Sequence, residues 1–450
     1  MTPTAVFTPP PMPPPGVIAG TFSSDRAPLA YQDLKFTLHR KLLDRINLEA
    51  LSSMPSERMR AEVRVAVARL VDEERTPLSL VEKDKIIDEI LDEVFGLGPL
   101  EPLLQDNTIS DILVTGPKLV YVERNGKLVR TPVEFKDNAH LLRIIEKVVS
   151  RVGRRVDESS PMVDARLPDG SRVNAAIPPI AVDGPLLSIR RFGKSAMTAE
   201  GLVSRLAFTP EMLFFLKSAV KARLNILISG GTGSGKTTLL NALSAFIPED
   251  ERIVTIEDAA ELRLQQTHVA RMETRPANIE GKGAVHIREL VINALRMRPD
   301  RIIVGEVRSE EALDMLQAMN TGHDGSLTTI HANTPRDAVG RLEVMIGMAS
   351  STMGVRSIRQ QVASAVDLFV QVSRFSDGTR RVTHVTEVVG MEGEVITLQD
   401  LFLFNKTGLN EQGKVTGRFR GTGTRPRSYE RIQGCGINMP MDIFSTETVI

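Results

Sequence analysis

The chain has one cysteine, no tryptophan and no excess of charge of either sign among its 450 residues. Because Cys435 stands alone, a disulfide framework within the chain and a cysteine-rich zinc site are excluded, and a reducing compartment is expected. Lys plus Arg and Asp plus Glu are both 56, so the net charge is zero, and aromatic residues make up 4%. This composition gives no support to a nucleic-acid coat or to a binder of acidic lipids.

Long apolar runs and a targeting signal are absent as well. No uncharged apolar run reaches about 18 residues, so we expect no membrane span. The N-terminus, "MTPTAVFTPPPMPPPGVIAG", has no basic start and is broken by prolines, which argues against a secretory signal. Eight of the first 28 residues are proline, so we expect residues 1–30 to form a disordered or polyproline-like tail. A passive extension is our expectation for this tail, and a recruiting role is the alternative.

The remaining chain divides by its hydrophobic period. Residues 31–104 contain "DLKFTLHRKLLDRI" and "MRAEVRVAVARLVDEE", whose apolar residues lie three and four apart, which predicts an N-terminal helical bundle. Residues 105–195 carry short alternating runs, a "RNGK" turn, the amphipathic helix "AHLLRIIEKVVSRVG" and a second hairpin turning at Asp169-Gly170. This pattern predicts an α+β domain.

Residues 196–405 alternate apolar strands with helices. The strands are "LNILIS", "ERIVTIE", "DRIIVGE" and "SLTTIHA", and this alternation predicts an α/β domain with a parallel sheet that is covered on both faces. A hairpin turning at Asp377-Gly378 is expected near the end of this domain. Residues 406–450 are Gly-rich and basic, with weak strand signals, and we treat them as a separate C-terminal segment.

A phosphate-binding loop is the strongest motif in the sequence. "NILISGGTGSGKTTLLNAL" contains G-x-x-x-x-G-K-[ST] between an expected strand and an expected helix. Glycines without a Cβ let backbone N–H groups wrap around phosphates. Lys236 is expected to reach the β- and γ-phosphates of ATP, and Thr237 to offer its hydroxyl to Mg²⁺. The expected nucleotide-binding residues are Gly230, Gly231, Thr232, Gly233, Ser234, Gly235, Lys236, Thr237 and Thr238.

Carboxylates follow two of the apolar strands. "RIVTIED" ends in Glu257 and Asp258, and "RPDRIIVGE" ends in Glu306, with Gly305 where an aspartate is usual. Ligands of open parallel sheets bind beyond the carboxyl ends of the strands, so these side chains are expected to face the phosphate loop. We expect Glu306 to orient the attacking water and to hold Mg²⁺ through water, with Glu257 as the second candidate. Capping of the following helix is an equally open role for Asp258.

Four motifs in order resemble one family. "GGTGSGKTT", "TIEDAAEL", "RMRPDRIIVGEVR" and "TGHDGSLTTIHANTP" are similar to the Walker A motif, Asp box, atypical Walker B motif and His box of the secretion-superfamily ATPases. "VDESSPMVDARLPDGSRVNAAIPP" and "LSIRRF" resemble the N-terminal sensor domain of this family. "RPANIEGKGAVHIRELVINALRMRPD", the helical N-terminal bundle and the tail "GKVTGRFRGTGTRPRSYERIQGCGI" resemble its CpaF/TadA branch, which powers Tad (Flp) pilus assembly. The resemblance spans residues 31–444 and implies a RecA-like P-loop ATPase domain that follows a PAS-like sensor domain and a helical bundle.

The resemblance also implies roles for two histidines. His323 and His331 would lie near the γ-phosphate and sense or relay the nucleotide state. Imidazole suits this role because it can donate to a phosphate and changes charge near neutral pH. Simple packing is the alternative, and a zinc site is disfavoured because the stretch offers only Asp324 as a further ligand.

Arginines from the sensor domain and from a neighbouring subunit reach the phosphates in this family. Arginine suits the role because its planar, permanently charged fork matches phosphate oxygens. Each arginine taken alone is equally well read as a solvated surface residue. The candidates are Arg166, Arg172, Arg190 and Arg191, with Arg308 as a weaker one.

The function implied by the resemblance is that of a motor. We expect a cytoplasmic, homohexameric ATPase that uses Mg-ATP to power pilus assembly, with retraction as an option, through inner-membrane platform proteins, its only contact with the membrane. The first alternative is a type IV secretion traffic ATPase that moves DNA or effector protein. Nucleic acid is an unlikely partner for the main hypothesis, yet a nucleic-acid translocase on a RecA core and a silent nucleotide switch remain as further alternatives.

Overall fold

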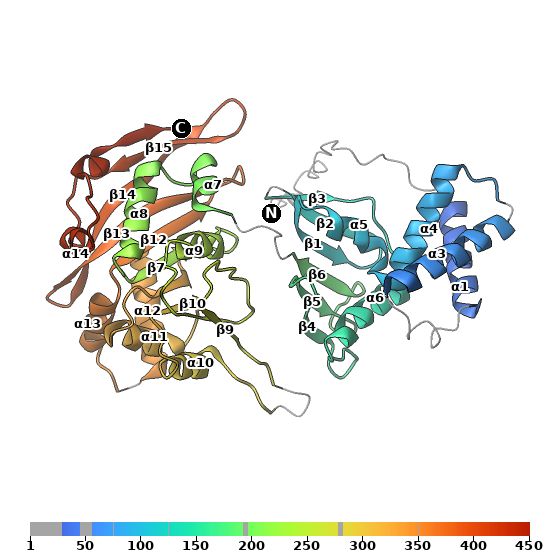
Figure 1. The fold of residues 1–450 in the computed structure, drawn as a ribbon, viewed down its shortest axis with the longest axis horizontal. Helices are drawn as coiled ribbons and strands as arrows, with labels where there is room; N and C mark the ends of the chain where they lie inside the picture. The colour runs from blue at the N-terminus through green and yellow to red at the C-terminus, as the bar shows by residue number, and fades with distance from the viewer. Residues whose placement is uncertain are drawn as a thin grey trace, which may run out of the picture. The chain divides into compact units, whose positions relative to one another are not determined.

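The chain folds into two compact units, residues Met1–Phe192 and Gly193–Ile450, in a computed structural model (Figure 1). The expected proline-rich tail lies, up to residue 28, outside the described residues. The structure describes residues 29–45, 56–74, 76–124, 126–191, 197–277, 282–350 and 352–450.

In the described part of unit 1, the first three helices share an apolar core. Their apolar residues recur every three or four positions, so each helix buries one stripe against the other two. Helix α4 starts at a capping box in which Ser79 and Glu82 satisfy each other's backbone N–H groups. The helices are α1 (Leu29–Arg45), α3 (Ser56–Glu73) and α4 (Leu80–Phe95).

The rest of unit 1 is a six-stranded antiparallel sheet in the order β3-β2-β1-β6-β5-β4, with α6 packed on one face. Leu97, Leu100 and Leu103 join this core, so the α+β body begins before the boundary that we expected at residue 105. Both expected hairpins form, β2–β3 and β4–β5. The elements are η1 (Gly98–Leu100), α5 (Glu101–Gln105), β1 (Ile109–Thr115), β2 (Leu119–Arg124), β3 (Lys127–Arg130), α6 (Asn138–Arg151), β4 (Met162–Arg166), β5 (Arg172–Ala176) and β6 (Leu186–Arg190).

Unit 2 is built on a ten-stranded sheet in the order β16-β15-β14-β13-β12-β7-β11-β10-β8-β9. The strands from β12 to β9 in this order run parallel, as the alternation of strands and helices predicts. Strands β7, β8, β10 and β11 are nearly continuous apolar runs, which is typical of strands buried on both faces. The parallel strands are β7 (Ile226–Gly230), β8 (Ile253–Glu257), β9 (Val269–Glu273), β10 (Arg301–Val307), β11 (Leu327–His331) and β12 (Leu368–Arg374).

Helices cover both faces of this sheet (Figure 1). One face packs on α8 and α9, and the other packs on α10, α11, α12 and α13. The helices of unit 2 are α7 (Ala199–Ser204), α8 (Pro210–Lys221), α9 (Lys236–Ser244), α10 (Ile287–Ala294), α11 (Glu311–Asn320), α12 (Pro335–Ala349) and α13 (Val355–Ala365).

The C-terminal segment belongs to unit 2. Strand β14 (Val395–Leu409) crosses the boundary that we expected at residue 405, and β15 pairs with it. The apolar side chain of Phe444 joins the core shared with α8 and α9. The weak sequence signal of this segment follows from its glycines, which lower strand propensity. The remaining elements are β13 (Arg380–Glu392), β15 (Val415–Gly421), α14 (Tyr429–Gly434), η2 (Met441–Ser445) and β16 (Glu447–Val449).

Two edges of the unit 2 sheet matter for function. We call the end at which the parallel strands finish the C-edge, and the end at which they start the N-edge. Strands rise about 3.3 Å per residue, so residues at opposite ends of β10 lie roughly 16–20 Å apart. Separately, no helix in the described ranges is both long and apolar enough to cross a bilayer.

Candidate active site

The phosphate loop lies at the C-edge between β7 and α9, as its motif predicts. Gly230 ends β7, and Gly235, with a φ of 99°, turns the chain into α9 at Lys236. Lys236 Nζ donates hydrogen bonds to the carbonyl oxygens of Gly230 and Gly231 at 3.1 and 3.2 Å. The N-terminus of α9 therefore points its backbone N–H groups into the loop, an arrangement that favours a bound phosphate.

Glu306 lies beside the lysine of the loop. Its Oε1 is 3.9 Å from Lys236 Nζ, within ion-pair distance. Arg308 donates to Glu306 Oε2 at 3.1 and 2.6 Å through Nε and Nη2, and to Asp258 Oδ2 at 3.0 Å through Nη1. Arg308 thus bridges the two carboxylates within the same chain, and the structure brings Glu306, Asp258 and Lys236 together as the sequence predicts.

Glu257 ends β8 and is only 3% exposed. Its Oε2 accepts from the backbone N–H groups of Glu261 and Leu262 at 2.7 and 2.9 Å, whereas its buried Oε1 has no hydrogen-bond partner among the described residues. Burial raises the pKa of this carboxyl against the opposing effect of the two N–H donors. A buried oxygen without a partner is costly, so this atom is available to a water, a cation or a nucleotide group.

Gly305 lies close to the Glu257 side chain at the β10 position where an aspartate is usual. A Cβ at this position would lie 3.0 Å from Glu257 Cγ, which is tighter than ordinary packing. An aspartate here would therefore require the Glu257 side chain to shift by a few tenths of an ångström. The position that normally carries a carboxylate is a glycine in this chain. The carboxylates at this place belong to Glu306, the next residue of β10, and to Glu257 at the end of β8.

His331 also lies at the C-edge. It ends β11 in register with Gly230, the first residue of the loop, and its side chain is partly exposed. Thr329, two residues earlier on the same strand, donates to the Gly305 carbonyl at 2.7 Å. The structure therefore places His331 next to the strand end that leads into the phosphate loop.

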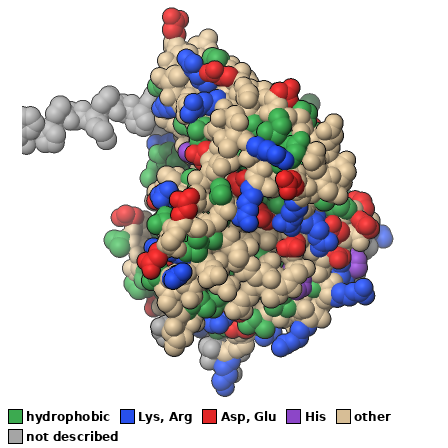
Figure 2. Space-filling view, turned by 90° about the vertical axis from the view of Figure 1, so that its left-hand side faces the viewer, with side chains coloured by type: hydrophobic (Ala, Val, Ile, Leu, Met, Phe, Trp, Pro, Cys, Tyr) green, Lys and Arg blue, Asp and Glu red, His purple; other side chains and the backbone are tan. Residues whose placement is uncertain are grey.

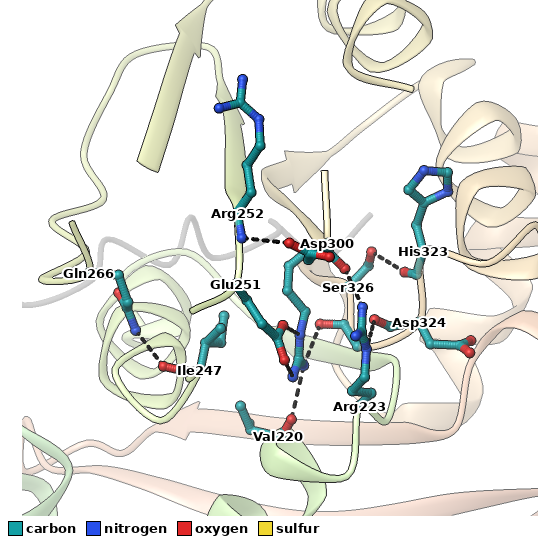
Figure 3. A network of polar contacts seen from close by, with 12 residues as sticks. Val220, Arg223, Ile247, Glu251, Arg252, Gln266, Asp300, His323, Asp324 and Ser326 are labelled. Atoms are coloured by element: carbon teal, nitrogen blue, oxygen red, sulfur yellow. Dashed lines mark hydrogen bonds and ion pairs between the residues drawn. The ribbon is translucent and has the colours of Figure 1, made fainter. Parts of the chain in front are cut away.

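His323 lies elsewhere, and the expectation that both histidines approach one γ-phosphate is not met within this chain. It precedes β11 at the N-edge, where its carbonyl accepts from Ser326 Oγ at 2.8 Å and its imidazole points away from Asp324 and Arg223 (Figure 3). The five-residue strand β11, about 13 Å from its first to its last residue, lies between the two histidines. The sequence spacing alone did not show this, because eight residues also fit a loop that folds back.

The N-edge carries its own polar network (Figure 3). Arg301 is fully buried and is paired with Glu251 through Nε and Nη2. Its Nη1 donates to the carbonyl oxygens of Val220 and Gly325 at 2.9 and 3.1 Å. A Cβ on Gly325 would lie 2.1 Å from that nitrogen, so only glycine admits the guanidinium here.

Three of the four candidate arginines form a row on unit 1. Arg166 pairs with Arg172 across β4 and β5, and Arg172 pairs with Arg190 across β5 and β6. Leu187 and Ile189, which alternate with Arg190 along β6, are buried in the core that α6 shares, so the arginine row lies on the opposite face of the sheet. Their contact with a nucleotide remains a proposal.

Arg191 does not join this row. Its guanidinium donates to the backbone carbonyls of Leu104 at 2.6 Å, of Ile109 at 3.1 Å and of Asp106. These bonds tie the start of β1 to the end of β6. Arg191 points to the other face of the sheet from Arg190, because successive side chains of a strand alternate. We therefore withdraw Arg191 as a candidate for phosphate contact.

Sequence reasoning missed two further arginines at the phosphate loop. Arg380 Nε donates to the Gly233 carbonyl at 2.8 Å. Arg374 Nη1 lies 3.2 Å from the position that a Cβ on Gly233 would occupy. Both residues flank the expected hairpin turn at Asp377-Gly378, and the parallel pairing of β12 with β7 was the missing information.

The loop and its carboxylates fit Mg-ATP. No cluster of three His, Cys, Asp or Glu side chains in the described ranges is arranged to hold a metal by itself. Mg²⁺ does not require such a cluster, because it is usually bound by one or two carboxylates together with substrate phosphates. Thr237 and Glu306 would hold the ion, and the unpartnered Glu257 Oε1 is a further oxygen for its waters.

Several known proteins are similar to this chain over most of its length. A family model described as "Type II/IV secretion system protein" matches residues 93–417. A putative conjugal transfer protein of Mycobacterium tuberculosis is 39% identical over 309 residues, which cover 67% of this chain and 87% of that protein. The type IV secretion system protein VirB11 of Bartonella henselae is 32% identical over 329 residues, covering 64% of this chain and 91% of that protein. The solved VirB11 ATPase of Brucella suis, in complex with sulphate, is 28% identical, with a TM-score of 0.36 over 67% of this chain and 96% of that one.

The matched residues 93–417 include the phosphate loop, both strand-end glutamates and His331. They cover more than half of the chain, and the mycobacterial relative matches over most of its own length. From this match and the geometry at the C-edge, the chain belongs to the type II/IV secretion system protein family and is an ATPase.

Proposed function

We propose that this ATPase works as a homohexameric motor on the cytoplasmic side of the inner membrane, which it reaches through partner proteins. The observation that supports a motor is the C-edge itself, where Glu306 lies 3.9 Å from Lys236 of the phosphate loop. In this proposal unit 1 contains a helical bundle and a PAS-like sensor domain, and unit 2 is a RecA-like ATPase domain. ATP hydrolysis changes the relative rotation of the two units, and the arginine row contributes to the nucleotide site.

The work that we assign to the motor is assembly of Tad (Flp) pili through an inner-membrane platform, with retraction as an option. This assignment rests on the resemblance of residues 31–444 to the CpaF/TadA branch. Transport of DNA or effector protein is the second candidate, and the names of a conjugal transfer relative and of VirB11 favour it. Loss of surface pili in cells that lack the gene supports the first candidate, and loss of DNA transfer to recipient cells supports the second.

A nucleic-acid translocase has less support. On the face of unit 2 shown in Figure 2, Lys and Arg side chains are interspersed with Asp and Glu side chains. Non-specific single-strand binders use a positively charged groove with stacking aromatics, and only 4% of this chain is aromatic. ATPase activity that is stimulated by DNA would restore this alternative.

The decisive test is the steady-state ATPase rate against protein concentration, with light scattering for mass. The rate per chain should rise as six-chain assemblies form. Glu306→Gln should lower it by roughly 10²-fold or more without changing the mass, because the carboxylate that orients water is lost. Glu310→Gln is a matched control, since Glu310 pairs with Arg288 and does not touch the loop. A rate that is independent of assembly would mean that one chain holds the complete site, and the arginine row would then be withdrawn.

A further inference from the structure

The hairpin between β12 and β13 extends past the phosphate loop. β12 runs parallel to β7, and Val372 pairs with Gly230, where β7 ends. β12 continues for two more residues to Arg374, which pairs across the hairpin with Arg380. Because β12 is longer than its neighbour at the C-edge, both arginines are carried to the level of the loop itself.

Both arginine side chains contact the loop. Arg380 Nε donates to the Gly233 carbonyl at 2.8 Å, and its Cδ is 3.3 Å from the position of a Cβ on Gly235. Arg374 Nη1 is 3.2 Å from the position of a Cβ on Gly233. Both arginines therefore lie next to Gly233 and Gly235. The strands that carry them, β12 and β13, lie on the other side of β7 from β11, which carries His331.

The hairpin is held rigidly. Asp377 accepts from the backbone N–H and the hydroxyl of Thr379 at 3.0 and 2.6 Å, and from the N–H of Val415 at 2.8 Å. Burial disfavours its charge, yet these donors lower the pKa of Asp377 to about 2. The rings of Phe375 and Phe404 pack edge to face with centroids 5.6 Å apart. The turn is thus fixed to β14 and β15, and it presents the arginines on a stiff support.

We propose that Arg374 and Arg380 belong to the nucleotide-binding site. Arg380 is a positioning residue that fixes the phosphate loop through the Gly233 carbonyl, and Arg374 contacts the polyphosphate of the nucleotide as a cation additional to Lys236. A guanidinium suits both tasks, because its fork donates several hydrogen bonds in one plane and stays charged. The inference deepens the nucleotide site described above and rests on it. It assigns to the C-terminal strands of the same chain a part in binding ATP.

The test is equilibrium binding of an N-methylanthraniloyl (mant) derivative of ATP, of the same derivative of ADP, and of mant-AMP, to the full chain. The label is excited at wavelengths at which protein side chains do not absorb, so its fluorescence is measured without a protein background. Arg374→Gln should weaken mant-ATP binding by about tenfold, which is typical for the loss of one charged hydrogen bond. The loss should be smaller for the ADP derivative and absent for mant-AMP, since Arg374 acts on the polyphosphate.

Arg380→Gln should weaken the ATP and ADP derivatives alike, because the loop binds both. It should also raise KM for ATP with a smaller change in kcat, and it should speed hydrogen exchange of the backbone N–H groups at residues 231–235. Arg380→Lys, which keeps a donor near Gly233, should recover part of the affinity. Arg420→Gln is the matched control, since Arg420 is an exposed arginine of β15 whose backbone lies opposite that of Glu447 on β16, outside the loop.

Three outcomes decide the matter. Binding by Arg374→Gln and Arg380→Gln that equals that of Arg420→Gln overturns the inference, while wild-type binding leaves the ATPase site in place. Equal losses for mant-AMP and mant-ATP in Arg374→Gln overturn the polyphosphate contact. A wild-type chain that fails to bind mant-ATP overturns the nucleotide site itself. If Arg380→Gln melts well below the wild type, Arg380→Lys and Arg374→Gln, whose side chains are exposed, carry the test.

Discussion

The two edges of the unit 2 sheet are both rich in polar side chains, yet they differ in how their buried charged side chain, Arg301 or Glu257, is paired. At the N-edge every guanidinium nitrogen of Arg301 donates to a carboxylate or carbonyl oxygen. The side-chain amide of Asn225 both donates a hydrogen bond through its nitrogen and accepts two through its oxygen. At the C-edge the buried Oε1 of Glu257 and the Ser234 hydroxyl have no partner among the described residues. His323 Nδ1 at the N-edge also lacks a partner among the described residues, so unpaired atoms alone do not identify the active site. The C-edge is distinguished by a buried carboxylate oxygen without a partner at a strand end beside the phosphate loop.

At each edge a glycine leaves room for a buried charged side chain, but, among the described residues, only at the N-edge is that side chain fully hydrogen-bonded. Gly325 admits the Arg301 guanidinium and completes its hydrogen bonds, and Gly305 admits the Glu257 side chain, which keeps one oxygen unpaired. The N-edge thereby gains stability. The C-edge keeps a carboxylate whose burial is unfavourable, as expected for a site that binds a charged ligand.

The largest effect should come from breaking the N-edge. Arg301→Leu leaves Glu251 without its buried partner, and the loss of such a pair typically costs about 3–5 kcal/mol. Urea unfolding should report this loss, while the ATPase rate per folded molecule should change little. Replacing both partners by leucine should cost less than the single change, because no unpaired charge remains. A single variant with wild-type stability would contradict the assignment of this pair to the stability of the fold.

The two histidines allow a direct comparison of the edges. His331→Ala should lower turnover by about 10²-fold, the usual cost of one lost donor at a developing charge, with nucleotide affinity largely intact. His323→Ala should leave turnover close to that of the wild type, because His323 lies at the N-edge. Steady-state kinetics and mant-ATP titration measure both variants. Equal losses of turnover in the two would show that the distance between them does not decide their roles.

The smallest effect is a pH-dependent change in stability at the C-edge. Burial raises the pKa of Glu257 above its ordinary value of 4.5, so the charged carboxylate destabilises the folded state near neutral pH. Glu257→Gln should therefore raise Tm at pH 8 by roughly 2–4 °C, the shift for about 1 kcal/mol in a unit of this size.

The sign of this effect follows from linkage. A carboxyl whose pKa is raised by folding favours the folded state when it is protonated. The Tm of the wild type should therefore rise relative to that of the variant as pH falls through the raised pKa toward 4.5. Thermal melts from pH 8 to pH 5 measure the difference, and ATPase assays should show reduced activity in the stabilised variant. A difference in Tm that does not change with pH would contradict the unfavourable burial of this charge.

Much of the fold follows from local sequence. Strands β7, β8, β10 and β11 lie where the apolar period predicts them, and both hairpins of unit 1 and the hairpin at Asp377-Gly378 lie where the turn residues predict them. β9, whose side chains are only partly buried, was not predicted. The C-terminal strands were weak predictions, because their glycines lower strand propensity. The boundary at residue 405 failed since β14 is one continuous strand that the change in composition does not interrupt.

The sequence by itself determined the phosphate loop, the carboxylates at the ends of β8 and β10, and the position of His331, because each follows a strand whose direction the alternation of strands and helices specifies. Only the tertiary structure decided which side chains share an edge. It separated His323 from His331 by the length of a strand, it bound Arg191 to backbone carbonyls, and it brought Arg374 and Arg380 to the loop. The physical reason is that strand pairing joins residues more than a hundred positions apart, and no local pattern encodes which strands become neighbours.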